Sequence, residues 1–401
     1  MSRGWMGAAG VVLLALCLPF SAKGQWSLTA GSLSTYDANS FRNHQQLPDW
    51  VQQVTAEVGR AFVWQKAEVS LGYGATGVFF RSYPDRRFLL QRASLDISLY
   101  PRKGAPPFLV SASCGWRTDE PAYSALDHQE LEVQVGRAGR ASDVPEVFAG
   151  YTRRIFPGLP EYSHSQWDLS LTLRHSFPSR TSLIVSPAVG YRIFAHKLTV
   201  VEVEGQPQMT RWRRWRRKVG LVRPGRSGTV QIVEMVSEIP EVALLDGQVR
   251  LGQALGQETG LSVEGEVWYR PSKASRSLTR LDYSYDPADV LSNDPYGFDG
   301  ERASARLTRI AWSGSEIELG ASAERRKYRD TPAFDLQGET QLATERKDAL
   351  SEFWLTWRIS LGMKWGHLGA LVDARWLRSR SNDPYHTWQG WAVSLGLNAS
   401  R

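Results

Sequence analysis

The chain has 401 residues, a formal net charge of +7 and two cysteines. Sixteen tryptophans and 35 glycines, with little helical periodicity, favour an all-β protein. Beyond the first two dozen residues no run of 18 apolar residues occurs, which excludes a transmembrane helix from the pattern. The length would suit two soluble domains, but no linker or shift of composition divides the chain, so we expect one domain.

Residues 1–24 have the three parts of a secretory signal peptide. Arg3 provides a positive n-region, residues 6–18 an apolar core, and Ala22-Lys23-Gly24 a small-x-small cleavage site. We therefore expect export, and a β-barrel domain that spans residues 25–401. Cleavage would remove Cys17 and leave Cys114 as the only cysteine, so no internal disulfide is possible.

Alternating apolar and polar side chains define the strands, most clearly in the hairpin of residues 350–379. Its strands are longer than the roughly five or six residues usual in soluble sheets, and they match the roughly 9 to 11 that cross a bilayer at a tilt. The pattern predicts sixteen strands, or fourteen if an end strand fails, at residues 25–36, 50–65, 67–80, 88–100, 107–118, 128–139, 146–156, 166–176, 182–204, 229–254, 259–270, 301–313, 316–327, 348–361, 368–379 and 388–398.

The connections between these strands are alternately short and long. Short links fall at residues 177–181, 255–258, 314–315 and 362–367, and long ones at 37–49, 157–165, 205–228, 271–300 and 328–347. Outer-membrane barrels have short periplasmic turns and long extracellular loops, and an even strand number places both termini in the periplasm. We therefore predict a single transmembrane antiparallel up-and-down β-barrel.

Aromatic residues fall toward the strand ends, as two interfacial girdles require. Those near the long loops are Trp116, Trp167, Tyr269, Trp376 and Trp391, and those near the short turns are Trp26, Trp64, Trp312 and Trp365. A tryptophan-rich soluble core is the alternative, but it would bury tryptophan in mid-strand as readily as at the ends. Cys114 shares the parity of Trp116, so we predict that it faces lipid.

Charged residues occupy the opposite parity, and no dry core could hold so many of them. We expect them to line a lumen that is filled by water or by protein: Arg92, Asp96, Arg117, Asp168, Arg174, Asp246, Arg250, Glu264, Glu266, Glu318, Arg326, Glu352, Arg358, Asp373 and Arg375. Three arginines, Arg60, Arg153 and Arg309, sit on the lipid-facing parity, where an arginine at the midplane costs about 2–4 kcal/mol. Either they lie near an interface or a bulge shifts the phase.

The last predicted strand completes a resemblance to a known class. Trp391, Val393, Leu395 and Leu397 form one apolar face, and the signal peptide, paired strands and loop lengths precede them. The chain resembles bacterial outer-membrane β-barrel proteins of porin-like size. The terminal strand is similar to the signal read by the barrel assembly machinery, although the chain ends in Arg401 instead of an aromatic residue. The resemblance implies an integral place in the outer membrane, with its lipids, lipopolysaccharide and the assembly machinery as partners.

Two long loops carry concentrated charge. Residues 205–228 contain a basic, tryptophan-bearing stretch that suits phosphates of lipopolysaccharide, acidic glycans or a permeating anion: Arg211, Trp212, Arg213, Arg214, Trp215, Arg216, Arg217 and Lys218. A solvated loop without a partner is the alternative, and export argues against nucleic acid. Residues 271–300 contain the candidate calcium ligands Asp286, Asp289, Asp294 and Asp299, although Asp-Pro steps are ordinary turn formers.

The sequence favours transport over catalysis. Seven histidines are scattered, and none has a serine or aspartate at a recognisable nucleophile spacing, so we expect no enzyme and no cofactor. The favoured function is a passive or gated pore for small hydrophilic solutes. The alternatives are a barrel plugged by its own side chains and loops, acting as an anchor or assembly partner, and a secreted glycan-binding β-protein such as a propeller. The long, one-sided strands argue against a propeller.

Overall fold

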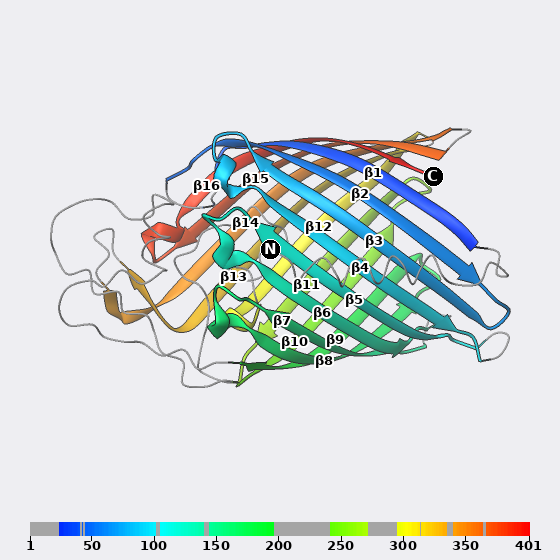
Figure 1. Cartoon of the computed structure of the whole chain (residues 1–401), viewed down its shortest axis with the longest axis horizontal. Helices are drawn as coiled ribbons and strands as arrows, with labels where there is room; N and C mark the ends of the chain where they lie inside the picture. Colours follow the sequence, from blue (N-terminus) through cyan, green and yellow to red (C-terminus); the bar gives the residue numbers. More distant parts are fainter. Residues whose placement is uncertain are drawn as a thin grey trace.

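The computed structural model describes residues 24–40, 42, 45–101, 105–139, 144–195, 241–271, 295–312, 314–334, 340–363 and 366–401. These residues form sixteen antiparallel strands, each paired with its neighbours in sequence, and β1 (Gly24–Asp37) pairs with β16 (Trp388–Ser400) to close the barrel (Figure 1). The prediction of a sixteen-strand all-β barrel is confirmed.

The remaining elements follow in chain order. The strands are β2 Asp49–Val63, β3 Ala67–Phe80, β4 Phe88–Leu99, β5 Phe108–Asp119, β6 His128–Arg137, β7 Glu146–Ile155, β8 His164–Ser176, β9 Thr181–Phe194, β10 Glu241–Ala254, β11 Thr259–Tyr269, β12 Asp299–Trp312, β13 Ser315–Phe334, β14 Thr340–Met363 and β15 Gly366–Ser381. Single-turn 3-10 helices are η1 Pro84–Arg86, η2 Ser124–Leu126, η3 Pro160–Tyr162, η4 Pro295–Gly297 and η5 Pro384–His386. Within the described ranges, no helix has the length and apolar character needed to span a membrane.

The two faces of the closed sheet differ in chemistry. One parity carries large apolar side chains that are more than half exposed, among them Leu319, Phe353 and Leu395. The other parity is polar, and it is the concave face. Tyr296, in the loop between β11 and β12, hydrogen-bonds to Asp168 on β8 at 3.3 Å, which requires the loop to reach across the inside of the barrel. The apolar parity therefore forms the outer wall.

The prediction of a loop at residues 328–347 is wrong. β13 and β14 extend into this region from both sides, and their ladder ends at Phe334 paired with Thr340. The register shifts on either side of Pro332, which has no N–H for the ladder. In this extension the backbone N–H and C=O groups are paired between the two strands, and no apolar face is needed for that pairing. The alternation of apolar and polar residues therefore did not predict it. The predicted strand segments 196–204 and 229–240 lie outside the described residues.

The three arginines on the outer wall all lie near strand ends. Arg60 sits three residues before the end of β2, and its guanidinium stacks on the rings of Trp26 and Phe62 at 4.9 and 4.6 Å. Arg153 is two residues from the end of β7. Arg309 is three residues from the end of β12 and directly precedes a register shift between Ile310 and Trp312. The interface interpretation fits all three, and a bulge accompanies the last.

Aromatic side chains mark both ends of the outer wall. Trp26 and Trp312 are 55% and 54% exposed on the side of the short turns, and Trp391 is 59% exposed on the side of the long loops. Leucine and valine occupy the wall between them, including Val249 and Val263. Trp365 lies outside the described residues. The outer wall thus has the two aromatic girdles that the sequence predicted.

Candidate functional site

The lumen wall is charged. The structure places the fifteen charged residues proposed for the lumen on the concave face, because the register aligns each of them with other residues of that parity. Arg92 of β4 reaches Glu132 of β6 at 3.0 Å, and it also donates to the Ser113 hydroxyl of the intervening strand β5 at 2.9 Å. The pair therefore spans three neighbouring strands of the lumen wall.

An ion-pair network covers the lumen wall from β12 to β15. Arg358 contacts Glu316 at 2.8 Å and Glu318 at 3.4 Å, and Arg306 approaches Glu318 at 3.8 Å. The indole N–H of Trp354 donates to Glu318 at 2.7 Å. Trp354 occupies the polar parity, so its ring lies on the lumen wall, where Gly320 opposite leaves the space that it fills.

The network continues on β14 and β15. Arg375 contacts Asp373 at 2.7 Å and Glu352 at 3.1 Å, and the Thr356 hydroxyl donates to Asp373 at 2.5 Å. The Arg375 side chain is 47% exposed and that of Arg358 50%, so water reaches both. Hydrated pairs of this kind contribute only about 0–1 kcal/mol to stability. Their importance is instead the charged, wetted surface that they present to a solute.

The long-loop end of the barrel is built from five inward turns. Each 3-10 helix lies immediately before a descending strand, namely β4, β6, β8, β12 or β16, and these turns are on the left in Figure 1. Each brings one buried side chain to the mouth: Arg86, Leu126, Tyr162, Tyr296 and His386. The mouth is therefore lined by loop residues, whereas the lumen below is lined by strands.

Side chains from four loops pack into a small apolar core beside the mouth. Tyr123, Phe156 and Leu159 are buried there, and Leu47 and Tyr83 pack against them from two further loops. Burial of a side chain of this size contributes about 1.5–3 kcal/mol, which is enough to hold loops together that lack regular ladders.

Asp127 ties one of these loops to the barrel. Its carboxylate accepts a hydrogen bond from the backbone N–H of Asp119 at 2.6 Å, at the end of β5. Burial raises the pKa of the Asp127 carboxyl, although this hydrogen bond and the charge of Arg117 act in the opposite direction. Burial likewise raises the pKa of the Tyr123 hydroxyl in the adjacent apolar core.

Tyr296 anchors the end of the segment between β11 and β12 against the inner face of the nearby strands β8, β9 and β10. Its ring lies 3.9 Å below the Arg192 guanidinium, and its hydroxyl donates to Asp168. Gly190 of β9 makes room for it, because a Cβ there would lie 1.9 Å from the Tyr296 hydroxyl oxygen. Tyr296 also packs with the buried Val242 of β10. Residues 295–298, at the end of this loop, are therefore held against the inner wall of the barrel.

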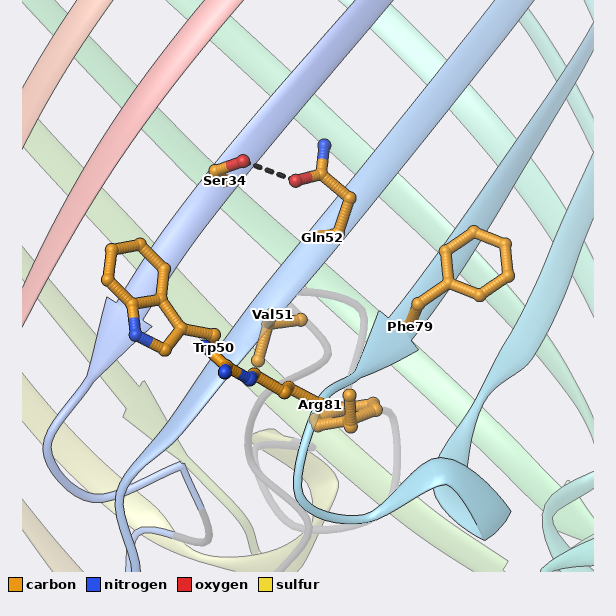
Figure 2. A pocket seen from close by; sticks show the side chains of 7 residues that line it. Ser34, Trp50, Val51, Gln52, Phe79 and Arg81 are labelled. Carbon is orange, nitrogen blue, oxygen red and sulfur yellow. Dashed lines mark hydrogen bonds between the residues drawn. The ribbon is translucent and has the colours of Figure 1, made fainter.

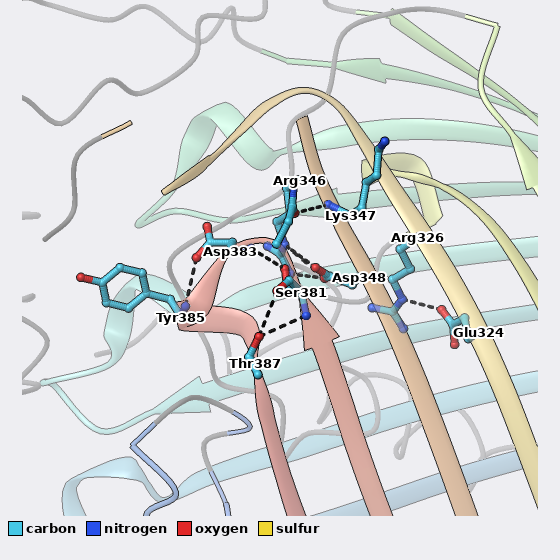
Figure 3. A network of polar contacts seen from close by, with 10 residues as sticks. Glu324, Arg326, Arg346, Lys347, Asp348, Ser381, Asp383, Tyr385 and Thr387 are labelled. Carbon is cyan, nitrogen blue, oxygen red and sulfur yellow. Dashed lines mark hydrogen bonds and ion pairs between the residues drawn. The ribbon is translucent and has the colours of Figure 1, made fainter. Parts of the chain in front are cut away.

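Buried ion pairs complete the mouth on the side of β13 and β14. Arg346 donates to both carboxylate oxygens of Asp348, at 3.1 and 2.5 Å, and lies 4.2 Å over the ring of Tyr328 (Figure 3). The side chains of Arg346 and Asp348 are 8% and 4% exposed. In the deeper lumen, Arg358 and Arg375 are about half exposed, whereas their partners Glu318 and Asp373 are 11% and 9% exposed, so water reaches the arginines there.

A repeated pentapeptide precedes two of the descending strands. Ser-Asn-Asp-Pro-Tyr occurs at residues 292–296, before β12, and at 381–385, before β16. In the second copy the Asp383 carboxylate accepts the N–H of Tyr385 at 3.0 Å and caps the turn (Figure 3). Sequence reasoning missed Tyr296 because it treated residues 271–300 only as an acidic loop. The repeat was the available signal.

A shallow cavity of about 250 Å³ opens on the outer wall between β1, β2 and β3 (Figure 2). Ser34 and Gln52 face one another there and are hydrogen-bonded, and Gln52 also donates to Ser32 at 2.7 Å. Trp50 and Phe79 flank the cavity. The mutual hydrogen bonds allow these polar side chains to lie on an otherwise apolar wall. The cavity is smaller than most ligand pockets.

The charged loop candidates have little described structure. The basic residues 211–218 and the aspartates Asp286, Asp289 and Asp294 lie outside the described residues. Asp299 is described, and it contacts the Arg329 guanidinium at 2.5 Å while accepting the N–H of Arg270 at 2.8 Å. Two cationic neighbours make it a poor calcium ligand. Over the described ranges, no three metal-ligating side chains come together.

These features define the class of architecture. Sixteen antiparallel strands close into a barrel with an apolar outer wall, aromatic girdles at both ends and a charged, hydrated interior. This is the fold of outer-membrane β-barrel proteins.

Comparison with known proteins identifies no family for this chain. No protein-family model matches the chain, and a search of curated proteins finds no match. Among solved structures, it is similar to OmpTdeltaL8, a loop-deletion mutant of an outer membrane protein of Vibrio cholerae (11% identity, TM-score 0.46, 94% of this chain and 99% of that one). It is also similar to the outer membrane protein OpdK (7%, 0.49, 94% and 98%) and to OprD (9%, 0.48, 95% and 97%), both of Pseudomonas aeruginosa. These likenesses concern the fold alone, so the argument for function depends on the geometry of this chain.

Proposed function

We propose that this protein is a water-filled channel of the bacterial outer membrane for small hydrophilic solutes. One observation carries the proposal: three arginine side chains on the concave wall remain about half exposed, with Arg92 at 62%, Arg358 at 50% and Arg375 at 47%. In a barrel filled by its own side chains these groups would be buried. Their exposure instead supports a hydrated path along the strands.

The outer wall supports the membrane location. Leu28, Leu319 and Leu397 are more than half exposed on it, and each would favour transfer from water to lipid at about 25 cal/mol per Å². A soluble protein rarely exposes a continuous apolar belt, which argues against a secreted glycan-binding protein. The backbone of Arg401 pairs with Leu28, so the start of β1 and the end of β16 share the short-turn end, which we assign to the periplasm.

The packed mouth would set the size of the permeating solute. Tyr296 and the loop core narrow the long-loop end, whereas the strand-lined lumen below is wetted. A solute would pass the mouth first and then meet alternating carboxylates and guanidinium groups. The same packed mouth is the observation that favours the second candidate function, a closed barrel that acts as an anchor or assembly partner.

The basic loop would add a site for anions outside the barrel. It follows β9, whose described end at Phe194 lies at the long-loop end. Arginine pairs with phosphate through two parallel hydrogen bonds, so lipopolysaccharide is a suitable partner for residues 211–218.

Planar-bilayer recording tests the proposed function. The detergent-extracted protein should give discrete conductance steps, and liposomes that contain it should swell in small sugars and amino acids. Heat-unfolded protein is the control and should give neither. A folded, heat-modifiable barrel without conductance would overturn the channel and favour the closed barrel. Recovery of the native protein from the soluble fraction without detergent would overturn the membrane location.

A further inference from the structure

The outer wall of β13–β15 carries a group of cations just beyond the aromatic girdle at the long-loop end. We call this group the basic wall surface, and it comprises Arg325, Lys327, Lys347, Arg378 and Arg380. All five have the outward parity, and four of them are exposed, whereas Arg378 is partly exposed. None of them belongs to the lumen or to the basic loop.

The strand register fixes the height of each cation above the girdle. Phe353 pairs with Trp376, which pairs with Trp391, so these rings form one row across β14, β15 and β16. Two residues further toward the long loops, Ser351 pairs with Arg378. After two more residues, Ala349 lies between Arg325 and Arg380. Lys327 and Lys347 pair with each other one further step out.

These steps span a considerable distance. At about 3.4 Å per residue, the three cationic rows lie roughly 7, 14 and 20 Å along the strands from the aromatic row. Strands of such barrels tilt by about 35–45°, so these distances correspond to roughly 5, 10 and 16 Å along the membrane normal. Aromatic side chains mark the boundary between acyl chains and polar headgroups. The basic wall surface therefore extends from that boundary well into the polar layer.

The surface has an excess of positive charge. Arg325 is paired with Glu301 at 3.3 Å and Lys327 with Glu345 at 3.0 Å, and all four side chains are at least 40% exposed. Exposed pairs of this kind are weak and can exchange partners. Within the described part of the chain, no carboxylate lies in ion-pair distance of the remaining three cations, Lys347, Arg378 and Arg380.

Another sector of the barrel shows that this charge is local. At the same end of β1 and β2 the outward residues are Tyr36 and Trp50, whose rings lie 5.4 Å apart. On β9 and β10 the outward pair is Tyr191 and Glu241, joined by a hydrogen bond. The outer wall is thus cationic over β13–β15 and aromatic or acidic in these other sectors.

We propose that the basic wall surface binds the phosphate groups of lipopolysaccharide in the outer leaflet. This inference rests on the proposed membrane location. A phospholipid places one phosphate near the aromatic row, whereas a phosphorylated glycolipid carries several phosphates at increasing heights. Three cationic rows spread over roughly 10 Å along the membrane normal match the second ligand better. Arginine forks at the two lower rows suit bidentate contact with phosphate, and lysines suit the more hydrated outer region.

The test measures lipopolysaccharide binding to the purified full chain in non-ionic detergent, by native mass spectrometry and by titration. The wall variant combines Lys347→Gln, Arg378→Gln and Arg380→Gln. Its matched control combines Lys66→Gln, Arg137→Gln and Arg309→Gln, three exposed cations at the short-turn end. The two variants lose the same charge and the same residue types, so only position differs.

The wall variant should bind lipopolysaccharide about tenfold more weakly, because three charge-assisted contacts are lost, and the control should change less than about twofold. Dephosphorylated glycolipid should bind the wild type as weakly as lipopolysaccharide binds the wall variant. Equal losses in the two variants would overturn the proposal, since net charge alone would then explain binding. Wild-type binding of phosphatidylglycerol that equals binding of lipopolysaccharide would overturn it as well.

Two further measurements distinguish failure of the proposed lipid site from failure of the proposed channel or of barrel assembly. Single variants Arg378→Gln and Arg380→Gln should each weaken binding a few-fold, so the test survives if the triple variant fails to assemble. Heat-dependent mobility and channel conductance should be unchanged in all these variants. A wild-type protein that shows no conductance would count against the proposed channel but not against the proposed lipid site. A wild-type protein that binds lipopolysaccharide no better than the wall variant does would refute the lipid site alone.

Discussion

Gly190→Ala should open the mouth of the barrel. A Cβ at this position would lie 1.9 Å from the Tyr296 hydroxyl oxygen and 2.9 Å from a carboxylate oxygen of Asp168. Both distances are far below ordinary van der Waals contact, and Gly190 belongs to a paired strand that cannot easily shift. The tyrosine must therefore leave its place, and the loop end that it anchors must move with it.

The size of the effect on the loop can be estimated from the interactions that Tyr296 would lose. Tyr296 would lose its hydrogen bond to Asp168, worth about 0.5–1.5 kcal/mol, and its contact with Arg192, worth about 0.5–2 kcal/mol. A total of about 1–3.5 kcal/mol changes the ratio of anchored to released loop by roughly 5- to 400-fold. The barrel itself, held by complete ladders around its circumference, should remain folded.

Single-channel recording and hydrogen exchange measure the two consequences. The variant should show a larger unit conductance than the wild type and faster amide exchange at residues 296–298. Gly150→Ala is the matched control, because it faces the same lumen from β7 and its Cβ would meet only ordinary contacts at 3.8 and 3.9 Å. Tyr296→Ala should reproduce the Gly190→Ala phenotype.

A double variant decides whether the reasoning is correct. If Gly190→Ala acts by expelling Tyr296, adding Tyr296→Ala should change conductance no further. Additive effects would show that the alanine acts through another part of the mouth. Equal effects of Gly190→Ala and Gly150→Ala would refute the steric argument altogether.

Three other predictions concern the wall, the lumen and the basic loop. Cys114 pairs with the exposed Leu131 on the outer wall, so an apolar maleimide should label it and a membrane-impermeant charged one should not; rapid labelling by the charged reagent would mean a register error of one residue. Arg375→Gln leaves two lumen carboxylates without their shared cation, so the cation-over-anion permeability ratio, measured from the reversal potential in a salt gradient, should rise roughly twofold. Glu352→Gln should lower the same ratio. A change in the same direction in both variants would contradict this reasoning. The basic loop is neutralised in the variant Arg213→Gln, Arg214→Gln, Arg216→Gln and Arg217→Gln. If the loop stands outward, this variant should bind lipopolysaccharide more weakly in a salt-sensitive assay, with ion selectivity unchanged; if it folds inward, anion selectivity should fall. No change in either property would indicate a solvated loop.

Alternation of side chains was enough to predict the barrel. A period of two assigns each residue of a strand to one face whatever the strand pairs with, so the apolar wall and the lumen charges could be read locally. Phe353 and Arg358 fall on opposite faces for this reason alone. Strand number followed from counting such segments, and loop lengths gave their direction. At residues 328–347 the apolar positions of the alternating pattern are missing, and the prediction of a loop there was wrong. The strands continue into this region because a ladder needs only backbone hydrogen-bonding groups.

Contacts between distant segments required the tertiary structure. Gly190 and Tyr296 are separated by more than a hundred residues, and no local pattern shows that one must be small for the other to fit. The mouth is likewise assembled from loops that meet only after the sheet has closed. The sequence by itself determined which face each strand residue takes, because a strand carries that information in its own period. Only the closed barrel decided the register that stacks Arg378, Arg325 and Lys347 above the aromatic row, since pairing and closure depend on all sixteen strands together.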